Sequence, residues 1–323
     1  MITSELDVSA QPVAVRDPGA PLAGRRVLVT GGTGFLGAHL CRALGALGAE
    51  VHGVSRRPPD RSDSEVQWQP ADLASVAAVS AVFDHARPDV VFHLTSHGIG
   101  SPGIEHVLPT LQGDLVPTIN VLTAATRCGA RVVMAASLEE PLTSRAVPPS
   151  PYAAAKWAGT GYARMFHALY GTSVVITRPF MTYGPGQRPL KLIPHAILTL
   201  LRNEAPRLGS GRRLVDWVYV DDVIRGLLLA AEQPGLEGAE LDLGSGRLVS
   251  VRDVIERLVR LTGSTARPAF GALPDRPFEV ERVAEAGAAF ARLGWNVEVT
   301  LEDGLQRTVD WYRDHGSDGG EIR

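Results

Sequence analysis

The chain has 323 residues, of which 45% are hydrophobic and 21% charged, a composition typical of a globular rather than a disordered protein. Its formal net charge of −3 excludes the broad basic surface on which nucleic-acid binding depends. The two cysteines, Cys41 and Cys128, are too few for a disulfide scaffold, and no apolar run is long enough for a membrane span, so we expect a cytoplasmic protein without a membrane partner.

From Arg25 onward, short apolar runs alternate with longer segments of helical pattern. Continuous apolar strands separated by helices are typical of a parallel sheet covered on both faces. The predicted fold class is therefore α/β, with a doubly wound parallel-sheet Rossmann domain. The predicted strands are 27–30, 51–55, 90–94, 132–136 and 174–177, and the predicted helices begin at Phe35 and Leu73 or cover 117–128 and 152–170.

The second half of the chain is expected to divide between two bodies. After the Gly- and Pro-rich segment 183–189, the pattern predicts a helix over 190–202, a return to the sheet over 217–231 and 240–243, and helices from Ser250 and Glu302. We expect mobile tails at both ends of the chain. The expected divisions are tails at 1–22 and 316–323, a Rossmann domain of 23–182 plus about 215–245, and a smaller mixed C-terminal lobe of 183–214 plus about 246–315.

Three glycines follow the first predicted strand and open the first predicted helix. Gly31 permits a tight turn, Gly34 lets the backbone approach a pyrophosphate, and Gly37 lets the helix pack on the strand. The first backbone N–H groups of the helix, at Phe35 and Leu36, are available to phosphate oxygens. This context predicts a dinucleotide-binding turn, and the alternative is a purely structural glycine turn.

The residues after the second strand bear on the choice of cofactor. In the NAD-selective version of this fold, an acidic side chain there binds the ribose 2′-hydroxyl. This chain has Ser55, Arg56 and Arg57 instead, which suit a 2′-phosphate, so NADP(H) is favoured over NAD(H). The alternative is that the arginines are simply solvated. A third strand lies between 51–55 and 90–94, which makes 90–94 the fourth strand and 132–136 the fifth. Asp72 and Leu73 follow this third strand and are placed to contact adenine, although Asp72 equally suits a helix cap.

A candidate proton-transfer group lies at the start of the predicted helix 152–170. Tyr152 and Lys156 are four residues apart and therefore share one helix face. An adjacent cation stabilises a phenolate, and Ser137, just past the fifth strand, can hydrogen-bond the substrate oxygen. Only two of the 32 basic residues are lysines, Lys156 and Lys191, so both are candidates for positions where a guanidinium does not serve.

These motifs together resemble the extended short-chain dehydrogenase/reductase family, in its nucleotide-sugar-modifying branch, over about residues 25–315. The resemblance implies a nucleotide-diphosphate sugar as substrate, held in the C-terminal lobe, and a homodimer formed through a helical bundle that includes the Tyr152 helix. It also implies cofactor contacts from residues at the ends of two strands. The motifs are 30–37, 90–94, Ser137, Tyr152 with Lys156, 178–180, 183–189, 217–222, 243–246 and 293–295, and the added cofactor contacts are Leu94, Thr95, Ser96 and Pro179.

The resemblance further implies substrate contacts, which are His97, Thr182, Lys191, Leu192 and Arg207. His97 follows the fourth strand, where it either orients a sugar hydroxyl or is an ordinary polar loop residue. No metal site is predicted.

Three departures from the family pattern fall on the substrate side. Met181 replaces an asparagine and Val215 replaces an arginine, both of which contact the substrate diphosphate in the family. Only 15 positions separate Ser137 from Tyr152, so the intervening loop is short. The arginines that are candidates to replace the lost one are Arg212, Arg213 and Arg276.

The departures also bear on the reaction. A sugar 4,6-dehydratase of this family uses an Asp-Glu pair after the serine, whereas this chain has Leu138 and Glu139. Glu139 is either a base or a solvated loop residue. The sequence therefore favours an NADPH-dependent ketoreductase of a nucleotide-linked keto-sugar, such as a 4-keto-6-deoxyhexose. The alternatives are a C4 epimerase with retained NAD(P), a 4,6-dehydratase and a non-catalytic NADP-binding protein.

Overall fold

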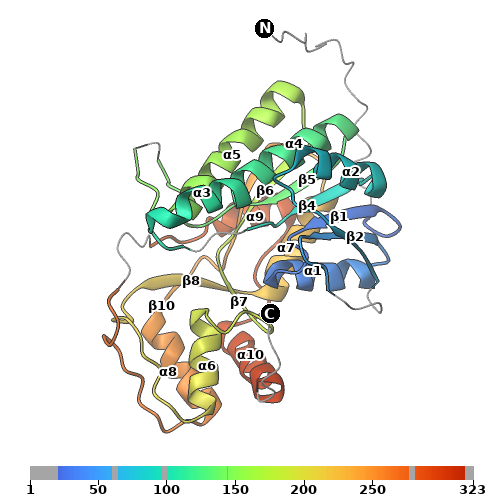
Figure 1. The fold of residues 1–323 in the computed structure, drawn as a ribbon. Coiled ribbons are helices and arrows are strands. Elements are labelled where there is room, and N and C mark those ends of the chain that lie inside the picture. Colours follow the sequence, from blue (N-terminus) through green and yellow to red (C-terminus); the bar gives the residue numbers. More distant parts are fainter. Residues whose placement is uncertain (1–20, 60–64, 97–99, 144, 276–280, 317–323) are drawn as a thin grey trace.

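The computed structural model describes residues 21–59, 65–96, 100–143, 145–275 and 281–316 (Figure 1). Its main body is a seven-stranded sheet with the order β3-β2-β1-β4-β5-β6-β9, in which every neighbouring pair is parallel. The predicted doubly wound α/β fold is thus confirmed. The strands are β1 (Arg26–Thr30), β2 (Glu50–Ser55), β3 (Val66–Pro70), β4 (Val90–His93), β5 (Arg131–Ala135), β6 (Val174–Pro179) and β9 (Glu240–Leu243).

Helices cover both faces of this sheet (Figure 1). On one face α1 (Phe35–Ala46) packs against α7 (Val220–Glu232), and α7 also contacts α9 (Ala286–Leu293). On the other face α2 (Val76–Ala86), α4 (Val116–Cys128) and α5 (Pro151–Tyr170) pack side by side. Three short segments lead into α4, namely η1 (Ile104–His106), α3 (Val107–Thr110) and the π-helical turn η2 (Leu111–Leu115). Among the described helices, none is long and apolar enough to cross a lipid bilayer.

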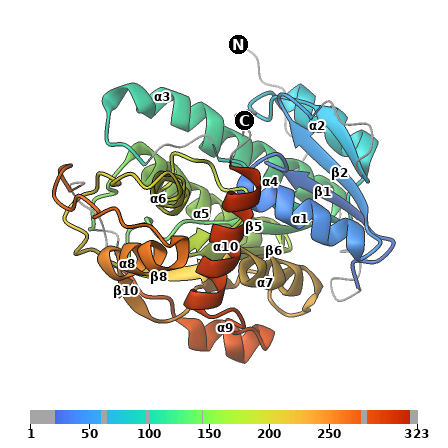
Figure 2. The same cartoon turned by 90° about the horizontal axis from the view of Figure 1, so that it is seen from below.

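A smaller lobe lies below the main sheet in Figure 1, and Figure 2 views the molecule from the side of this lobe. The lobe contains a three-stranded sheet of order β10-β8-β7. Strand β8 runs parallel to β7 and antiparallel to β10. The three helices α6, α8 and α10 pack against one another beside this sheet. The elements are β7 (Met181–Tyr183), α6 (Leu192–Leu201), β8 (Leu214–Tyr219), β10 (Leu248–Ser250), α8 (Val251–Thr262) and α10 (Leu301–His315).

Side-chain caps explain where several helices begin. The hydroxyls of Ser150, Ser250 and Thr300 accept backbone N–H groups at the starts of α5, α8 and α10. The prediction that a helix begins at Leu73 was wrong, because Ser75 caps α2 and Val76 is its first residue. Asp72 is not the cap, since its Oδ1 accepts the N–H of Ala74 at 3.0 Å within the preceding turn.

Two further boundary predictions need correction. Strand β8 does not return to the main sheet, because its apolar side chains, including Trp217, pack in the lobe; the chain rejoins the main body with α7, which packs on β5 and β6. Leu22, predicted to lie in a mobile tail, is buried, and its N–H donates to Glu232 at 3.1 Å. The earlier part of that predicted tail, and residues 317–323, lie outside the described residues.

The segment 184–189 is fixed between the two bodies. His39 on α1 contacts the carbonyl oxygen of Pro185 at 2.9 Å through its Nε2, and the Tyr312 hydroxyl on α10 donates to the carbonyl oxygen of Gln187. The side chain of Gln187 in turn donates to the carbonyl of Thr182 at 3.0 Å. The lobe is therefore held at the carboxyl edge of the sheet, where ligands bind in open α/β folds.

Candidate active site

The predicted dinucleotide turn connects β1 to α1, at the point where the strand order of the sheet reverses. Gly31 has φ +73°, and a Cβ there would lie 2.9 Å from backbone atoms of Leu94 and Thr95, so only glycine fits. A Cβ on Gly37 would lie 2.6 Å from the Cα of Gly32 and would overlap the carbonyl of Gly31. The glycines thus bring the N-terminus of α1 against the ends of β1 and β4.

The neighbouring residues fit a dinucleotide at this edge. Phe35 and Leu36 form the first turn of α1, whose N–H groups have no acceptor within the helix, and Gly34 is the N-cap without a side chain in the way. Thr95 follows β4, and no partner is found for its buried Oγ1 among the described residues. The N-terminus of α1 and the Thr95 hydroxyl therefore lie at the same edge of the main sheet.

The end of β2 carries the groups predicted to select the cofactor. The hydroxyl of Ser55 lies 3.3 Å from that of Thr33 in the glycine turn, and it also accepts the N–H of Arg57 at 3.2 Å. Arg56 and Arg57 are exposed. Ser55 therefore joins the pyrophosphate turn to the arginine loop, so that a ligand phosphate at this loop would meet two guanidiniums.

Ser137, Tyr152 and Lys156 are brought to the same edge of the sheet from β5 and α5. Tyr152 lies in the first turn of α5, after the Ser150 cap, and the side chain of Ser137, which is buried just past β5, is the hydrogen-bonding group that lowers the pKa of its phenol. Lys156 follows one turn later and is buried. The sequence-predicted group of three is therefore assembled.

Burial raises the pKa of the Tyr152 phenol, and the Ser137 hydrogen bond opposes this by lowering it. The carboxylates of Glu139, Asp114 and Glu140 raise the pKa further. Lys156 was predicted to lower the pKa of the phenol. Burial instead has the largest effect on this pKa, and it raises it. The phenol therefore stays protonated at neutral pH.

The ammonium of Lys156 is held by the ends of two strands. Its Nζ donates to the carbonyl oxygens of Thr95 and Ala135, both at 3.2 Å. Burial lowers the pKa of Lys156, while the charges of Asp114 and Glu140 raise it. The amine of Lys156 is thus buried and has a fixed position between β4 and β5.

Behind this lysine runs a buried polar chain that the sequence did not reveal. His93 receives the Thr30 hydroxyl at its Nδ1, at 2.8 Å, and contacts the Thr118 hydroxyl through Nε2 at 2.9 Å. Thr118 donates its own proton to the carbonyl of Asp114 at 2.8 Å, so His93 Nε2 is the donor. Burial, and secondly the charge of Lys156, lower the pKa of His93 to about 3, which keeps the ring neutral.

Asp114 is a second residue that sequence analysis missed. It is buried in the π-helical turn η2 and acts electrostatically on both Tyr152 and Lys156. Single π-helical turns inside helices occur often at functional sites. No motif in the sequence marks this aspartate, which lies in the segment Leu111–Leu115.

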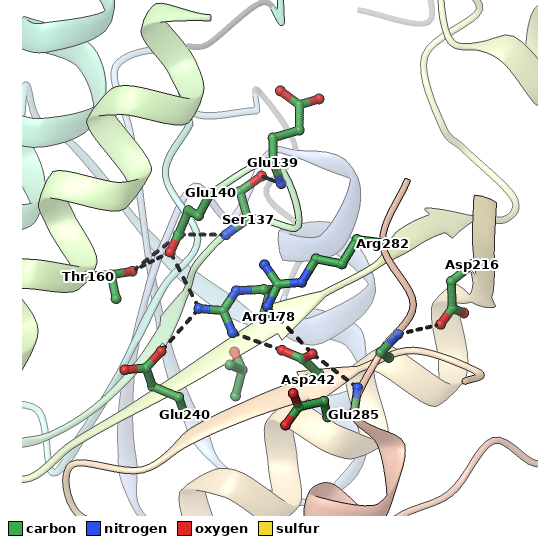
Figure 3. A network of polar contacts seen from close by, with 12 residues as sticks. Ser137, Glu139, Glu140, Thr160, Arg178, Asp216, Glu240, Asp242, Arg282 and Glu285 are labelled. Atoms are coloured by element: carbon green, nitrogen blue, oxygen red, sulfur yellow. Dashed lines mark hydrogen bonds and ion pairs between the residues drawn. The ribbon is translucent and has the colours of Figure 1, made fainter. Parts of the chain in front are cut away.

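The two glutamates after Ser137 differ in their surroundings (Figure 3). Glu139 is half-buried, its backbone N–H donates to the Ser137 Oγ at 3.2 Å, and its side chain points away from the polar network below. Glu140 is buried, and its carboxylate accepts the Ser137 N–H at 2.9 Å and the Thr160 hydroxyl at 3.0 Å. Glu139 is the glutamate predicted from the sequence as a candidate base, whereas the buried Glu140 was not predicted.

Arg178 joins Glu140 to a wider ion network at the end of β6 (Figure 3). Its guanidinium contacts Asp242 at 2.8 Å, Glu240 at 3.1 Å and Glu140 at 3.4 Å. Arg282 lies 3.7 Å from Asp242 on the other side. The network borders a polar cavity of about 240 Å³ between α5, β9 and α9.

The predicted substrate contacts in the lobe are less closely gathered. Thr182 is half-buried and donates to the Phe180 carbonyl at 3.0 Å; Leu192 and Arg213 are half-buried, and Lys191 and Arg207 are exposed. His97 and Arg276 lie outside the described residues. Of the remaining predicted cofactor contacts, Leu73 is buried, Leu94 and Pro179 are half-buried, and Asp72 and Ser96 are exposed.

Asp216 has a structural role in the lobe. The sequence did not indicate this role, because attention fell on the arginine that Val215 replaces. Its carboxylate accepts the N–H groups of Ser245 at 2.7 Å, Gly246 at 3.0 Å and Ala284 at 3.0 Å, as well as the Ser245 hydroxyl. This buried carboxylate fastens β8 to two loops of the lobe. Within the described part of the chain, no group of three His, Cys, Asp or Glu side chains is arranged to hold a metal ion.

The chain is similar to proteins of known type over most of its length. Residues 27–244 match the family described as NAD dependent epimerase/dehydratase. A probable dTDP-glucose 4,6-dehydratase of Sinorhizobium fredii is 29% identical, with 90% of this chain and 93% of that protein covered.

Two solved structures are similar over 90% of this chain and 99% of theirs. A UDP-glucose 4-epimerase of Thermotoga maritima, with UDP-glucose, has 25% identity and a TM-score of 0.82. MoeE5, in complex with UDP-glucuronic acid and NAD, has 31% identity and a TM-score of 0.77.

Proposed function

Because this chain belongs to the NAD dependent epimerase/dehydratase family, we propose that it catalyses hydride transfer at C4 of a nucleotide-diphosphate hexose, as an NADPH-dependent reductase of a 4-keto-6-deoxy sugar. The observation that carries the proposal is the assembly of Ser137, Tyr152 and Lys156 at the sheet edge that also holds the Gly31 turn. A proton donor, a second hydroxyl and a fixed cation thus lie beside a dinucleotide-binding turn.

The residues that would hold the cofactor are those of the glycine turn, the first turn of α1, Ser55 with its two arginines, and Thr95. Lys156 would contact the ribose next to the nicotinamide, since its ammonium is already fixed at the ends of β4 and β5. When bound, the nicotinamide supplies the hydride.

The chain's own residues supply the proton and orient the sugar. Ser137 hydrogen-bonds the keto oxygen and holds it beside the phenol. Tyr152 donates its proton to that oxygen as it becomes an alkoxide, and the raised pKa of the phenol ensures that the proton is present at neutral pH. Lys156, one turn further along α5, would stabilise the phenolate that remains.

The preference for NADP(H) rests on the loop after β2. Arg56 and Arg57 are exposed guanidiniums at the position where an acidic residue binds the ribose in NAD-selective proteins of this fold. Bidentate, charge-assisted hydrogen bonds from arginine match a 2′-phosphate. A net reductase also needs a cofactor that exchanges with solvent, which fits an open, solvated loop.

A C4 epimerase is the second candidate, and the observation favouring it is the similarity to an epimerase structure and to MoeE5 with NAD. The same three residues would then oxidise C4 and reduce it again from the other face. A 4,6-dehydratase, the type of enzyme to which the Sinorhizobium fredii relative is assigned, ranks third, because Leu138 stands where that reaction uses an aspartate. Glu139 remains available for proton abstraction in that case.

The nucleotide end of the substrate is expected in the lobe, next to Lys191, Leu192 and Arg207. Arg213 lies at the start of β8 and is our proposed replacement for the arginine that Val215 displaces. Thr182 and Glu139 border the sugar end in this proposal. Relatives with bound UDP-sugars support this arrangement by analogy.

Purified protein separates these candidates when it is mixed with nucleotide 4-keto-6-deoxy sugars and, separately, nucleotide hexoses, with NADPH absorbance and products followed together. Stoichiometric NADPH oxidation with only the keto-sugars supports the reductase. Interconversion of C4 epimers without net NADPH change supports the epimerase. No turnover of any sugar nucleotide despite tight NADPH binding supports a non-catalytic protein and refutes the proposal.

We also propose a homodimer formed through a helical bundle that includes α5. A cavity of about 560 Å³ with mainly apolar walls lies between the α3 region and the start of α5, and Val107, Leu111 and Val147 beside it are exposed. Exposed apolar clusters of this kind favour protein contacts. A monomeric mass by light scattering at micromolar concentration would contradict this proposal.

A further inference from the structure

Glu140 occupies a position that the mechanism above does not use. Its carboxylate is buried in the loop after β5 and receives donors from three directions: the backbone N–H of Ser137, the hydroxyl of Thr160 on α5 and the guanidinium of Arg178 on β6 (Figure 3). A buried carboxylate with this many donors is fully satisfied, and it links three elements at one point.

The helix α5 presents one face to this carboxylate. Tyr152, Lys156 and Thr160 are spaced four residues apart, so they lie along one side of the helix, and Thr160 is about 12 Å along the axis from Tyr152. Ser137 lowers the pKa of the phenol at one end of this face, while the Glu140 carboxylate accepts the Thr160 hydroxyl at the other end. The loop 137–140 is therefore attached to α5 at two places.

We propose that Glu140 is a positioning residue for the reaction proposed above, which fixes the Ser137 hydroxyl opposite the Tyr152 phenol by clamping the Ser137 loop to α5. The proposal rests on the proposed function for its kinetic consequence. The hydrogen-bond clamp itself stands on the geometry.

The distances favour a clamp over a simple ion pair. Arg178 already pairs with Asp242 at 2.8 Å and Glu240 at 3.1 Å, whereas its contact with Glu140 is longer, at 3.4 Å. The shorter bonds of Glu140 go to Ser137, at 2.9 Å, and Thr160, at 3.0 Å. The arginine therefore keeps two partners without Glu140, whereas the Ser137 N–H loses the acceptor that holds the loop.

The charge of Glu140 also acts on the proton donor. It raises the pKa of Tyr152, together with Glu139 on the same loop and Asp114 on η2, while the Ser137 hydrogen bond lowers it. Arg178, with Arg164 on α5 and Arg282 near α9, offsets part of this charge from the other side. Removing the charge of Glu140 should therefore lower the pKa of the phenol.

The test compares Glu140→Gln and Thr160→Val with wild type and with Glu256→Gln, which removes an exposed carboxylate on α8. In Glu140→Gln one amide oxygen cannot replace both carboxylate oxygens, and the amide NH₂ opposes the Arg178 guanidinium. We expect kcat to fall by about 100-fold, the cost of a displacement near 1 Å, with the KM for NADPH unchanged. Thr160→Val should show a smaller loss in the same direction.

Two readouts distinguish a positioning role from a structural one. Because Tyr152 must be protonated to donate, activity is lost as pH rises through its pKa, so the basic limb of the Glu140→Gln profile should move to lower pH. Amide hydrogen exchange, which needs no substrate, should accelerate over 137–139 in Glu140→Gln and Thr160→Val but not in Glu256→Gln.

Unchanged exchange over 137–139 in Glu140→Gln would overturn the proposal, as would a kcat loss accounted for by a smaller folded fraction. If wild type turns over no sugar nucleotide, the proposed function fails, and faster exchange of the loop still supports the clamp. If wild type is active and Glu140→Gln retains its kcat and its pH profile, the clamp does not position Ser137.

Discussion

Replacing Gly37 by alanine tests whether the cofactor turn depends on close packing. The added Cβ would lie 2.6 Å from the Cα of Gly32 and 2.8 Å from the carbonyl carbon of Gly31, and both are backbone atoms that cannot rotate away. The turn must therefore move by a substantial fraction of an ångström. Overpacking of this kind costs about 1–3 kcal/mol.

Helix propensity acts in the opposite direction but is smaller. Alanine is favoured over glycine by about 1 kcal/mol inside a helix, so the net loss of unfolding free energy in Gly37→Ala should be about 0–2 kcal/mol. The effect on cofactor binding has no such offset, because the moved atoms form the phosphate turn itself. We expect the dissociation constant for NADPH to rise about 10- to 100-fold, which corresponds to about 1.4–2.8 kcal/mol.

The assay is NADPH binding by fluorescence titration, together with thermal unfolding without cofactor. Gly287→Ala is the matched control, because Gly287 is exposed in the first turn of α9 and a Cβ there meets nothing within 4 Å. That variant should bind NADPH as wild type does. Wild-type affinity in Gly37→Ala would refute the reasoning, since it would mean that the turn does not form the binding site.

Three further predictions concern selectivity, thiol chemistry and stability. Arg56→Ala combined with Arg57→Ala should weaken NADPH binding about tenfold or more while NADH binding changes little, since each charge-assisted hydrogen bond contributes about 1.5–3 kcal/mol; an unchanged NADPH-to-NADH ratio of dissociation constants would contradict this. Burial raises the pKa of the Cys41 thiol to about 12, so the thiol stays protonated below that pH. A thiol reagent at pH 8 should therefore label one site in the folded protein, and this labelling should be lost in Cys128→Ser. Two rapidly labelled sites would be inconsistent with a buried Cys41. Asp216→Ala leaves three backbone N–H groups without their acceptor and should lower the unfolding free energy by about 3 kcal/mol or more in urea titration, and a change below about 1 kcal/mol would show that the lobe loops do not depend on it.

Local patterns in the sequence were sufficient for much of this fold. Buried strands such as β4 and β5 are short, continuous apolar runs in the sequence. The glycines at 31, 34 and 37 predict the turn between β1 and α1. The positions of Ser137, Tyr152 and Lys156 follow from the end of β5 and the spacing on α5. These features depend on short stretches of chain, which is why they can be read without the structure.

The wrong predictions of the α2 start and of the sheet that contains β8 arose where the local sequence suited two arrangements equally well. Asp72 and Ser75 are both suitable helix caps, and only the structure shows that Ser75 is used. The apolar run of β8 suits either sheet, and it joins the small one because it pairs with β7 and β10. Pairing partners far apart in sequence decide such cases.

The missed site residues have long-range partners and no motif of their own. His93 meets Thr30 across 63 positions and Thr118 across 25. Glu139 and Glu140 are adjacent and chemically identical, and only Glu139 matches a position of the Asp-Glu pair in the family pattern, so the sequence directed attention away from Glu140. The backbone course of the loop after β5 buries Glu140 against α5 and turns Glu139 away from the network.

The most direct test of the account is the turnover of Tyr152→Phe on a nucleotide 4-keto-6-deoxy sugar that wild type reduces. The substitution removes only the hydroxyl that meets Ser137 and leaves the cofactor turn untouched. We predict NADPH binding within twofold of wild type and a kcat lower by about 100- to 10,000-fold, the usual contribution of a general acid. A variant that binds NADPH normally and retains wild-type kcat would contradict the central claim that the Tyr152 phenol donates the proton.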